Sequence, residues 1–318
     1  MGGAGARVVV DMTVGVTVNT SGFKNEVDDS VRFAGEAAAA GLRSVWFGQV
    51  FGVDSPQLAA IVGREVPGLQ VGTAAIPVFG RHPLVVASQA LTAQAATHGR
   101  YHLGLAVGTK WLTEEGFGIP FERPIARLRE FLTVLRQLTE TGAADFHGEL
   151  LTATTPLPSR VAGAEAGVPL LVAAMGPQAL RASGELADGI MPYLAGPRVL
   201  AEHIVPAVTA AAEAAGRPAP RIVATVNAVV TDDAAALREQ LAEQLAFYER
   251  LPSYARVLEL GGYERAVDVA VIGDEKTVAA EVQRYRDAGA TEVIVSRTEF
   301  AGEANRNRAW ALLGELAG

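Results

Sequence analysis

The stretch VPLLVAAMGPQALRASGELADG, from Val168 to Gly189, joins an apolar run directly to a helical pattern. Pro169 to Ala173 has the length and the apolar side chains of a buried strand. Gly176 and Pro177 mark the junction, and proline is favoured at the first position of a helix because its φ angle is already helical. A strand that turns at once into a helix is the repeating unit of α/β folds.

The same unit recurs along the whole chain. Eight predicted strands cover residues 14–18, 44–47, 69–76, 101–107, 169–173, 189–193, 221–230 and 292–296. Predicted helices cover residues 28–40, 55–64, 83–97, 124–139, 177–187, 197–215, 233–250 and 275–288. A doubly wound sheet shows the same alternation and is the alternative. The count of eight and the absence of a mid-chain linker favour a single (β/α)₈ TIM barrel over residues 1–318.

Two segments exceed a minimal barrel. Residues 141–167 form a long insertion rich in Pro, Gly and Thr between the fourth helix and the fifth strand, where a lid or a small excursion is expected. Residues 251–271 follow the seventh helix and should add a short helix.

Composition excludes several classes of function. The net charge of -8 and the pI near 5.3 argue against a nucleic-acid or membrane-surface partner, since both need a basic footprint. The chain has no cysteine, and its five histidines lack metal-ligand spacing, so no metal site is expected. Gly2 to Ala6 lacks the apolar core of a signal peptide, and no apolar run is long enough to span a bilayer. We therefore expect a cytoplasmic protein.

In a barrel, the active site lies where the strands end. Gly104, Ala106 and Gly108 share one face of the fourth strand by the period of two, and this face is nearly bare. A bare inner face would admit a large flat molecule. Alternatively, these glycines only relieve crowding in the barrel core.

The junction at Gly176 is more specific. Pro177 at the first helical position leaves the amides of Gln178 and Ala179 without intrahelical partners. These donors and the positive end of the helix dipole form a potential anion site, to which Arg181 could add charge. The alternative is an ordinary strand-to-helix turn, of which a barrel needs eight. The chain shows no nucleophile elbow, P-loop or GxGxxG motif, so a cofactor that carries the chemistry fits better than the protein's own groups.

Four stretches together resemble the bacterial luciferase-like superfamily, and within it the branch of coenzyme F420-dependent oxidoreductases. They are GTAAIPVFGRHPLVVASQALTAQAATHGRYHLGLAVG (72–108), GIPFERPIARLREFLTVLRQL (118–138), VPLLVAAMGPQALRASGELADGIMPYLAGP (168–197) and VDVAVIGDEKTVAAEV (267–282). The resemblance covers most of the chain, and the order and spacing of the stretches agree with it. It implies a TIM-type barrel with an insertion between the fourth helix and the fifth strand, usually a homodimer.

The resemblance also implies which residues bind the cofactor. A non-proline cis peptide that backs the deazaflavin ring matches Ala75-Ile76, and the end of the fourth strand matches Gly108, Thr109 and Lys110. The phosphate-holding segment matches Ala174, Met175, Gly176 and Pro177, with Gln178 supplying a free amide. The phosphate and the glutamyl tail would need cations, for which Lys110, Arg81 and Arg181 are the candidates.

One departure from the family concerns proton transfer. Many deazaflavin enzymes carry an Asp-His pair just after the second strand, where this chain reads Phe47-Gly48-Gln49-Val50. Gln49 can hydrogen-bond a substrate or the ring but is no useful acid at neutral pH. Thr109, Glu114 and a substrate-held water are the remaining candidates for the proton donor.

The leading hypothesis is an F420-dependent oxidoreductase that moves a hydride between the deazaflavin C5 and a small organic substrate, in a pocket closed by the insertion. It would reduce an activated C=C, C=N or C=O bond or act as a dehydrogenase. The first alternative is an FMN-dependent luciferase-like monooxygenase on the same barrel. The second is a non-catalytic member that binds a cofactor or a partner.

Overall fold

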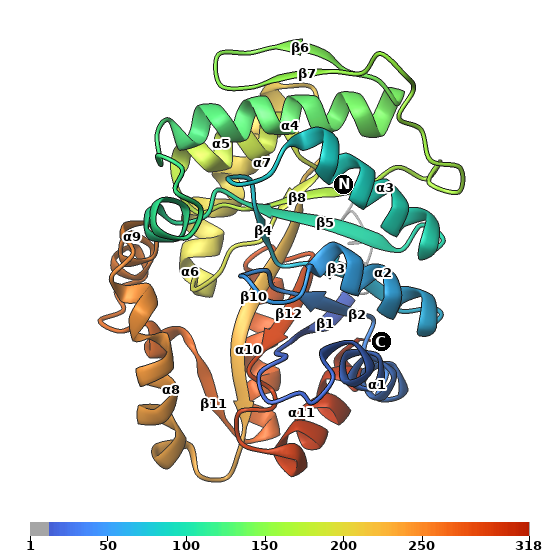
Figure 1. Cartoon of the computed structure of the whole chain (residues 1–318). Coiled ribbons are helices and arrows are strands. Elements are labelled where there is room, and N and C mark those ends of the chain that lie inside the picture. Colours follow the sequence, from blue (N-terminus) through green and yellow to red (C-terminus); the bar gives the residue numbers. More distant parts are fainter. Residues whose placement is uncertain (1–12, 318) are drawn as a thin grey trace, which may run out of the picture.

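A closed barrel of parallel strands organises the computed structural model, which describes residues 13–317 (Figure 1). Each strand pairs with its neighbours in chain order, and β9 pairs with β10 to close the ring. The expectation for Gly2 to Ala6 lies outside the described residues. The barrel strands are β1 (Thr13–Val18), β2 (Ser44–Phe47), β3 (Gln70–Thr73), β5 (Tyr101–Ala106), β8 (Leu170–Ala173), β9 (Gly189–Ile190), β10 (Arg221–Val230) and β12 (Glu292–Ser296). The predicted (β/α)₈ fold is confirmed.

Helices surround this barrel, and most begin where the sequence places a proline or an aspartate. They are α1 (Glu26–Ala39), α2 (Ser55–Glu65), α3 (Pro83–Ala96), η1 (Leu112–Gly116), α4 (Pro124–Thr141), α5 (Pro177–Leu186), α6 (Pro197–Val199), η2 (Leu200–Ile204), α7 (Val205–Ala214), α8 (Ala234–Glu249), α9 (Pro252–Gly261), η3 (Ala266–Val269), α10 (Glu275–Asp287) and α11 (Glu303–Leu316). The predicted helix over 197–215 is interrupted by a π-helical turn, η2, just before Pro206, which lacks the N–H that a regular turn would use. The sequence patterns did not predict α11.

Four further strands of the described residues lie outside the ring. β4 (Ile76–Pro77) pairs with β5, and β11 (Val271–Gly273) pairs with the end of β10 beyond the expected extra helix, α9. β6 (Asp145–His147) and β7 (Thr152–Thr154) form an antiparallel hairpin inside the insertion.

This hairpin lies on the outer side of α4 (Figure 1). The carboxylate of Glu130 on α4 accepts hydrogen bonds from the amides of Glu149, Leu150 and Leu151 at the hairpin turn. The insertion is therefore an excursion fastened to a helix. The expectation that it closes the pocket stays a prediction; besides the bonds to α4, the insertion contacts His82, in the loop between β4 and α3, which lies 3.0 Å from the carbonyl of Thr152.

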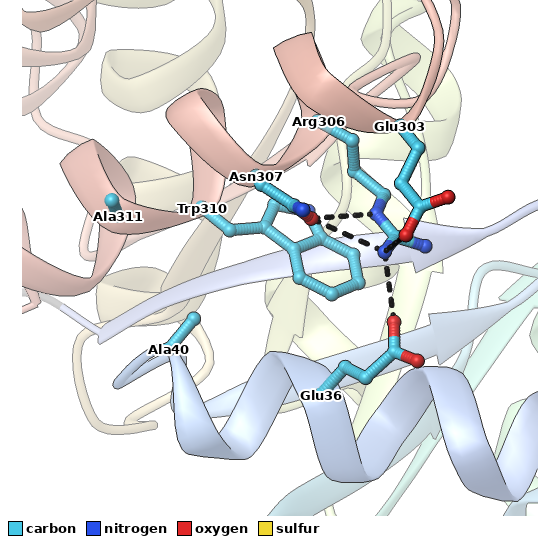
Figure 2. A pocket seen from close by; sticks show the side chains of 7 residues that line it. All are labelled: Glu36, Ala40, Glu303, Arg306, Asn307, Trp310 and Ala311. Atoms are coloured by element: carbon cyan, nitrogen blue, oxygen red, sulfur yellow. Dashed lines mark hydrogen bonds and ion pairs between the residues drawn. The ribbon is translucent and has the colours of Figure 1, made fainter.

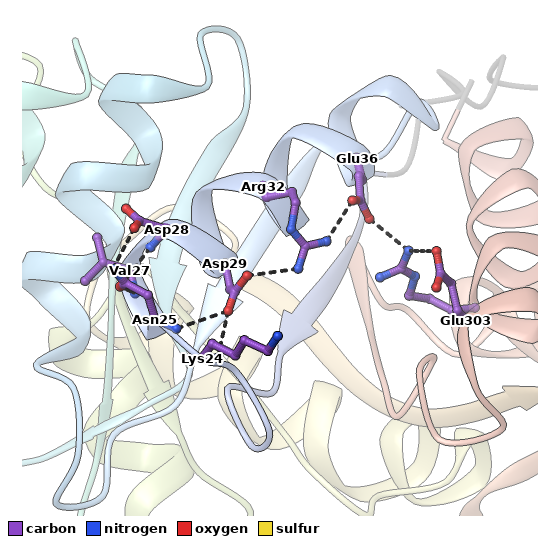
Figure 3. Close-up of polar contacts among 9 residues, drawn as sticks. Lys24, Asn25, Val27, Asp28, Asp29, Arg32, Glu36 and Glu303 are labelled. Carbon is purple, nitrogen blue, oxygen red and sulfur yellow. Dashed lines mark hydrogen bonds and ion pairs between the residues drawn. The ribbon is translucent and has the colours of Figure 1, made fainter.

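The first and last described helices are clamped together by Arg306 of α11. Its guanidinium binds Glu36 of α1 at 2.8 Å and lies 4.6 Å from the centroid of the Trp310 ring (Figure 2). Glu36 also pairs with Arg32, which reaches Asp29 near the start of α1 (Figure 3). Glu36, Arg306 and Trp310 border a hollow of about 410 Å³, whose lining residues are Glu36, Ala40, Glu303, Arg306, Asn307, Trp310 and Ala311. Its charges pair with one another, as expected of a structural clamp.

Candidate functional site

The interior of the barrel is sealed at mid-height. Trp46, Leu171, Met191, Val223 and Ile294 form one cluster, and none is more than 3% exposed. Four of these residues come from four different strands and Met191 directly follows β9, and only the inside of a closed barrel can bring their side chains into contact.

One step higher, the interior positions carry small side chains that are partly exposed. Ala74 follows β3, and Ala106, Ala173, Thr225 and Ser296 continue the inward-facing alternation of their strands. This contrast in size and burial marks the carboxyl ends of the strands as the open mouth of the barrel, the usual place for an active site in this fold.

The small residues on the inner face of β5 have different roles at its two ends. A Cβ on Gly104 would overlap the carbonyl oxygen of Thr73 and lie 2.8 Å from the sulfur of Met191, so this glycine relieves crowding. Ala106 is partly exposed at the mouth, and Gly108 just beyond it has a φ of +86°, which favours glycine. The prediction of a bare, open face is wrong for Gly104.

The start of α5 is open as predicted. Gly176 occupies the N-cap, no side chain caps the helix, and a Cβ on Gly176 would meet nothing within 4 Å. The first intrahelical amide is that of Leu180, which donates to the carbonyl of Gly176 at 2.9 Å. The amides of Gln178 and Ala179 remain as donors for a ligand. The segment Ala174–Met175 leads into this turn directly from β8.

The non-proline cis peptide lies one bond earlier than expected. It joins Ala74 to Ala75, while Ile76 and Pro77 have already resumed a strand beside β5. The amide of Ala74 is still held by the carbonyl of Phe47 at 2.8 Å, so the chain leaves β3 only after this residue. Ala75 keeps its place at the bend, whereas Ile76 is a fully buried strand residue.

The three candidates for hydrogen-bonding or proton transfer serve local structure. The side-chain oxygen of Gln49 accepts from the amide of Ser55 at 2.7 Å, at the start of α2. The hydroxyl of Thr109 accepts from the amide of Leu112 at 3.2 Å. Glu114 accepts from the amide of Phe121 at 3.2 Å, on an exposed turn. Each group has a structural partner, and the geometry brings none of them together with another.

The candidate cations are also paired. Lys110 is exposed and lies 3.8 Å from Glu114, while Arg181 is exposed and pairs with Glu185 on the next turn of α5. Arg81 is mostly buried and pairs with Asp54 at 3.4 Å. Of the three, Arg181 lies on the same helix as the open amides.

Sequence reasoning missed a set of aromatic residues at the mouth. Tyr193 follows β9, and its hydroxyl lies 3.2 Å from Oδ1 and 3.1 Å from Nδ2 of Asn227 on β10. Its ring contacts Tyr248 of α8 and Tyr254 of α9, with centroids 5.2 and 6.0 Å away. The dense aromatic run FYERLPSY (247–254), in a chain with only 6% aromatic residues, was the available signal.

Two other kinds of site are not found among residues 13–317. No group of three or more His, Asp or Glu side chains is placed to hold a metal ion. In the same part of the chain, no helix has the length and the apolar character needed to cross a membrane.

The fold and the position of the mouth define a TIM-barrel protein with its site at the strand ends. Residues 8–292 match the family described as luciferase-like monooxygenase, and the chain belongs to this family.

Three similar proteins illustrate the range of this family. A putative coenzyme F420-dependent oxidoreductase of Mycobacterium tuberculosis is 26% identical, over 87% of this chain and 92% of its own. An F420-dependent glucose-6-phosphate dehydrogenase of Kineococcus radiotolerans is 30% identical, over 82% and 85%. The solved F420-dependent tetrahydromethanopterin reductase of Methanopyrus kandleri superposes with a TM-score of 0.80 at 21% identity, over 96% and 98% of the two chains.

Proposed function

We propose that this protein is an F420-dependent oxidoreductase that acts on a small organic substrate. The observation that carries the proposal is the open start of α5, where Gly176 leaves room for a phosphate and two amides lack partners. Its similarity to proteins described as F420-dependent supports F420 as the cofactor. We also retain the homodimer as part of the proposal, to be tested by light scattering.

The residues of the mouth fit such a cofactor. The amides of Gln178 and Ala179 would hold the phosphate, with Ala174 and Met175 alongside it. The bend at Ala75, together with the segment of Gly108, Thr109 and Lys110, would flank the ring and its polar chain. When bound, F420 exchanges a hydride at C5 with a substrate carbon.

The chain's own residues position the substrate and exclude water from the site. The small side chains of Ala106 and Ala173 leave room at the mouth, while Trp46 and Met191 below them seal the barrel from beneath. In a reduction, the substrate carbon gains a hydride, and the heteroatom, or the second carbon of a C=C bond, gains a proton. The mouth must therefore present a hydroxyl or a water to that atom, and Tyr193 carries such a hydroxyl.

Gly176→Asp tests the phosphate site. The backbone here is extended, with φ -78°, and an added Cβ has no atom within 4 Å, so the barrel should fold with unchanged or higher thermal stability. The carboxylate would cap α5 itself and repel the phosphate. We expect the affinity for F420, measured by fluorescence titration, to fall by about a hundredfold, or about 2.7 kcal/mol.

Gly176→Ala is the matched control, because it adds a Cβ without charge or capping oxygen and should keep most of the affinity. Unchanged F420 binding in Gly176→Asp would overturn the assignment of this site. Tight binding of FMN with oxygen uptake by its reduced form would favour the monooxygenase. Binding of neither cofactor would favour the non-catalytic alternative.

A further inference from the structure

An aromatic wall lines one side of the barrel mouth. We use this name for Trp111, Tyr193, Phe247, Tyr248 and Tyr254. Besides the two contacts of Tyr193, Tyr248 lies 5.1 Å from Tyr254 and 5.8 Å from Phe247, and Phe247 lies 6.0 Å from Trp111, all between ring centroids. The interplanar angles of 69° to 85° are those of edge-to-face pairs, which hold rings in fixed orientations.

The wall runs from the barrel interior to the solvent. Tyr193 occupies an interior position next to Thr225 of β10, and its partner Asn227 is only 3% exposed. At the outer end, Trp111 is 52% exposed and Phe247 46% exposed, which is unusual for rings of this size. A continuous apolar surface that starts inside an active-site mouth and ends in solvent suits the apolar body of a ligand.

The inner end of the wall offers a neutral polar group. Burial raises the pKa of the Tyr193 phenol, so its hydroxyl stays protonated at any physiological pH. When Asn227 turns its Nδ2 toward this hydroxyl, the hydroxyl oxygen accepts that bond and its own proton is free for an oxygen of the ligand. A carbonyl or hydroxyl group of a substrate would satisfy it.

Two cations near the wall already have side-chain partners within the protein. Lys110, next to Trp111, lies within ion-pair distance of Glu114. Arg297, which follows β12, donates to the side chain of Gln244 on α8 at 2.8 Å. The wall itself has no charged side chain and offers only rings and neutral donors, which are the tyrosine hydroxyls and the indole N–H of Trp111, whereas a phosphorylated substrate would need free cations with directed donors.

We infer that the substrate is an uncharged, ring-bearing carbonyl compound or the corresponding alcohol. Its ring packs against Trp111, Phe247 and Tyr248, and its oxygen accepts from or donates to the hydroxyl of Tyr193. The inference rests on the proposed function for its chemistry, but the wall binds its ligand through this chain's own residues. Reduction would add a hydride, supplied by the reduced cofactor of the proposed function, to the carbonyl carbon and a proton, supplied by water, to the oxygen.

Binding of acetophenone by the full-length protein tests the wall directly, with and without F420, by titration calorimetry. Phe247→Ala should weaken acetophenone about tenfold, because it removes an exposed face of the wall. Tyr193→Phe keeps the ring and should weaken acetophenone several-fold, yet leave the binding of ethylbenzene, which lacks the oxygen, unchanged. Leu157→Ala, at an exposed apolar residue of the insertion, is the matched control and should change neither.

The outcomes separate this inference from the proposed function. F420 titration of Phe247→Ala should show unchanged affinity, because Phe247 lies on α8, which supplies none of the residues assigned to the cofactor. If F420 fails to bind but acetophenone binding still depends on Phe247, the proposed function falls and the wall stands. The inference is overturned if Phe247→Ala leaves the affinity for acetophenone unchanged. It is also overturned if glucose 6-phosphate competes with acetophenone for binding and reacts with F420 faster than acetophenone does.

Discussion

The two ends of the barrel interior carry different kinds of side chain. At the amino ends of the strands, Arg221 binds Glu292 at 2.6 Å and contacts Nδ1 of His102 at 2.8 Å, beneath the buried indole of Trp46. At the carboxyl ends, the corresponding positions carry Ala, Thr and Ser side chains that are partly exposed. The lower end is filled and internally bonded, whereas the upper end leaves space and free donors.

From this difference we expect the residues that stabilise the fold and the residues that bind a ligand to lie at opposite ends of the barrel axis. Side chains below mid-height have all their partners within the protein, so changing them should unfold the barrel without a specific effect on a ligand. Side chains at the mouth have few partners, so changing them should alter binding with little effect on folding. The substitutions below test this separation.

Trp46→Ala should have the largest effect. Trp46 is fully buried, and its Nε1 donates to the hydroxyl of Ser44 at 2.9 Å. Loss of the ring leaves a cavity in the sealed level, at a cost of about 4 kcal/mol in the free energy of unfolding. Urea unfolding measures it. Met175→Ala, at a partly exposed apolar residue of the mouth, is the matched comparison and should cost less than about 1 kcal/mol; equal losses would contradict the separation.

His102 should make the lower end sensitive to acid. Burial, followed by the nearby charge of Arg221, lowers its pKa to about 3, from an ordinary value of 6.5. Because the folded pKa lies below the unfolded one, the neutral ring stabilises the fold fully above pH 6.5. This stability is lost as the pH falls from 6.5 toward 3, at about 1.4 kcal/mol per pH unit, or about 2 kcal/mol by pH 5.

His102→Asn removes the titrating group, and the difference in unfolding free energy between pH 7 and pH 5 should shrink accordingly. His203→Gln, at an exposed histidine of η2, should leave that difference as it is in the parent protein. A parent protein equally stable at pH 5 and pH 7 would show that His102 does not carry this acid sensitivity.

The sequence predicted the elements of the barrel better than the contents of its mouth. The strands over 44–47, 221–230 and 292–296 have the predicted bounds, because apolar runs with clear ends specify buried strands. The predicted strand over 69–76 is instead divided at Ala74 and Ala75, since a cis peptide leaves no trace in hydrophobic patterning. The open cap at Gly176 was predictable because it depends on neighbouring residues alone.

The aromatic wall was not predictable in the same way. Trp111 and Phe247 are 136 positions apart in the sequence, and only closure of the barrel between β9 and β10 brings the end of β5 and α8 to one mouth. Gln49 is a different case. Its position at the end of β2 correctly placed it near the mouth, but its side-chain oxygen accepts a hydrogen bond from the amide of Ser55. Long-range contacts and the direction of a side chain in a loop both depend on coordinates that periodicity does not carry.

Ala106→Leu should have the smallest effect on folding and a clear effect on binding. Ala106 is partly exposed on the inner face of β5, so the larger side chain can extend into the mouth with a change of about 0.5 kcal/mol or less in unfolding free energy. It would occupy the space assigned to the cofactor, and F420 affinity should fall at least about tenfold. Ala106→Ser keeps the size and should retain that affinity. A loss of about 2 kcal/mol or more in stability for Ala106→Leu would mean that the mouth is as tightly filled as the level of Trp46, and the contrast between the two ends would fail.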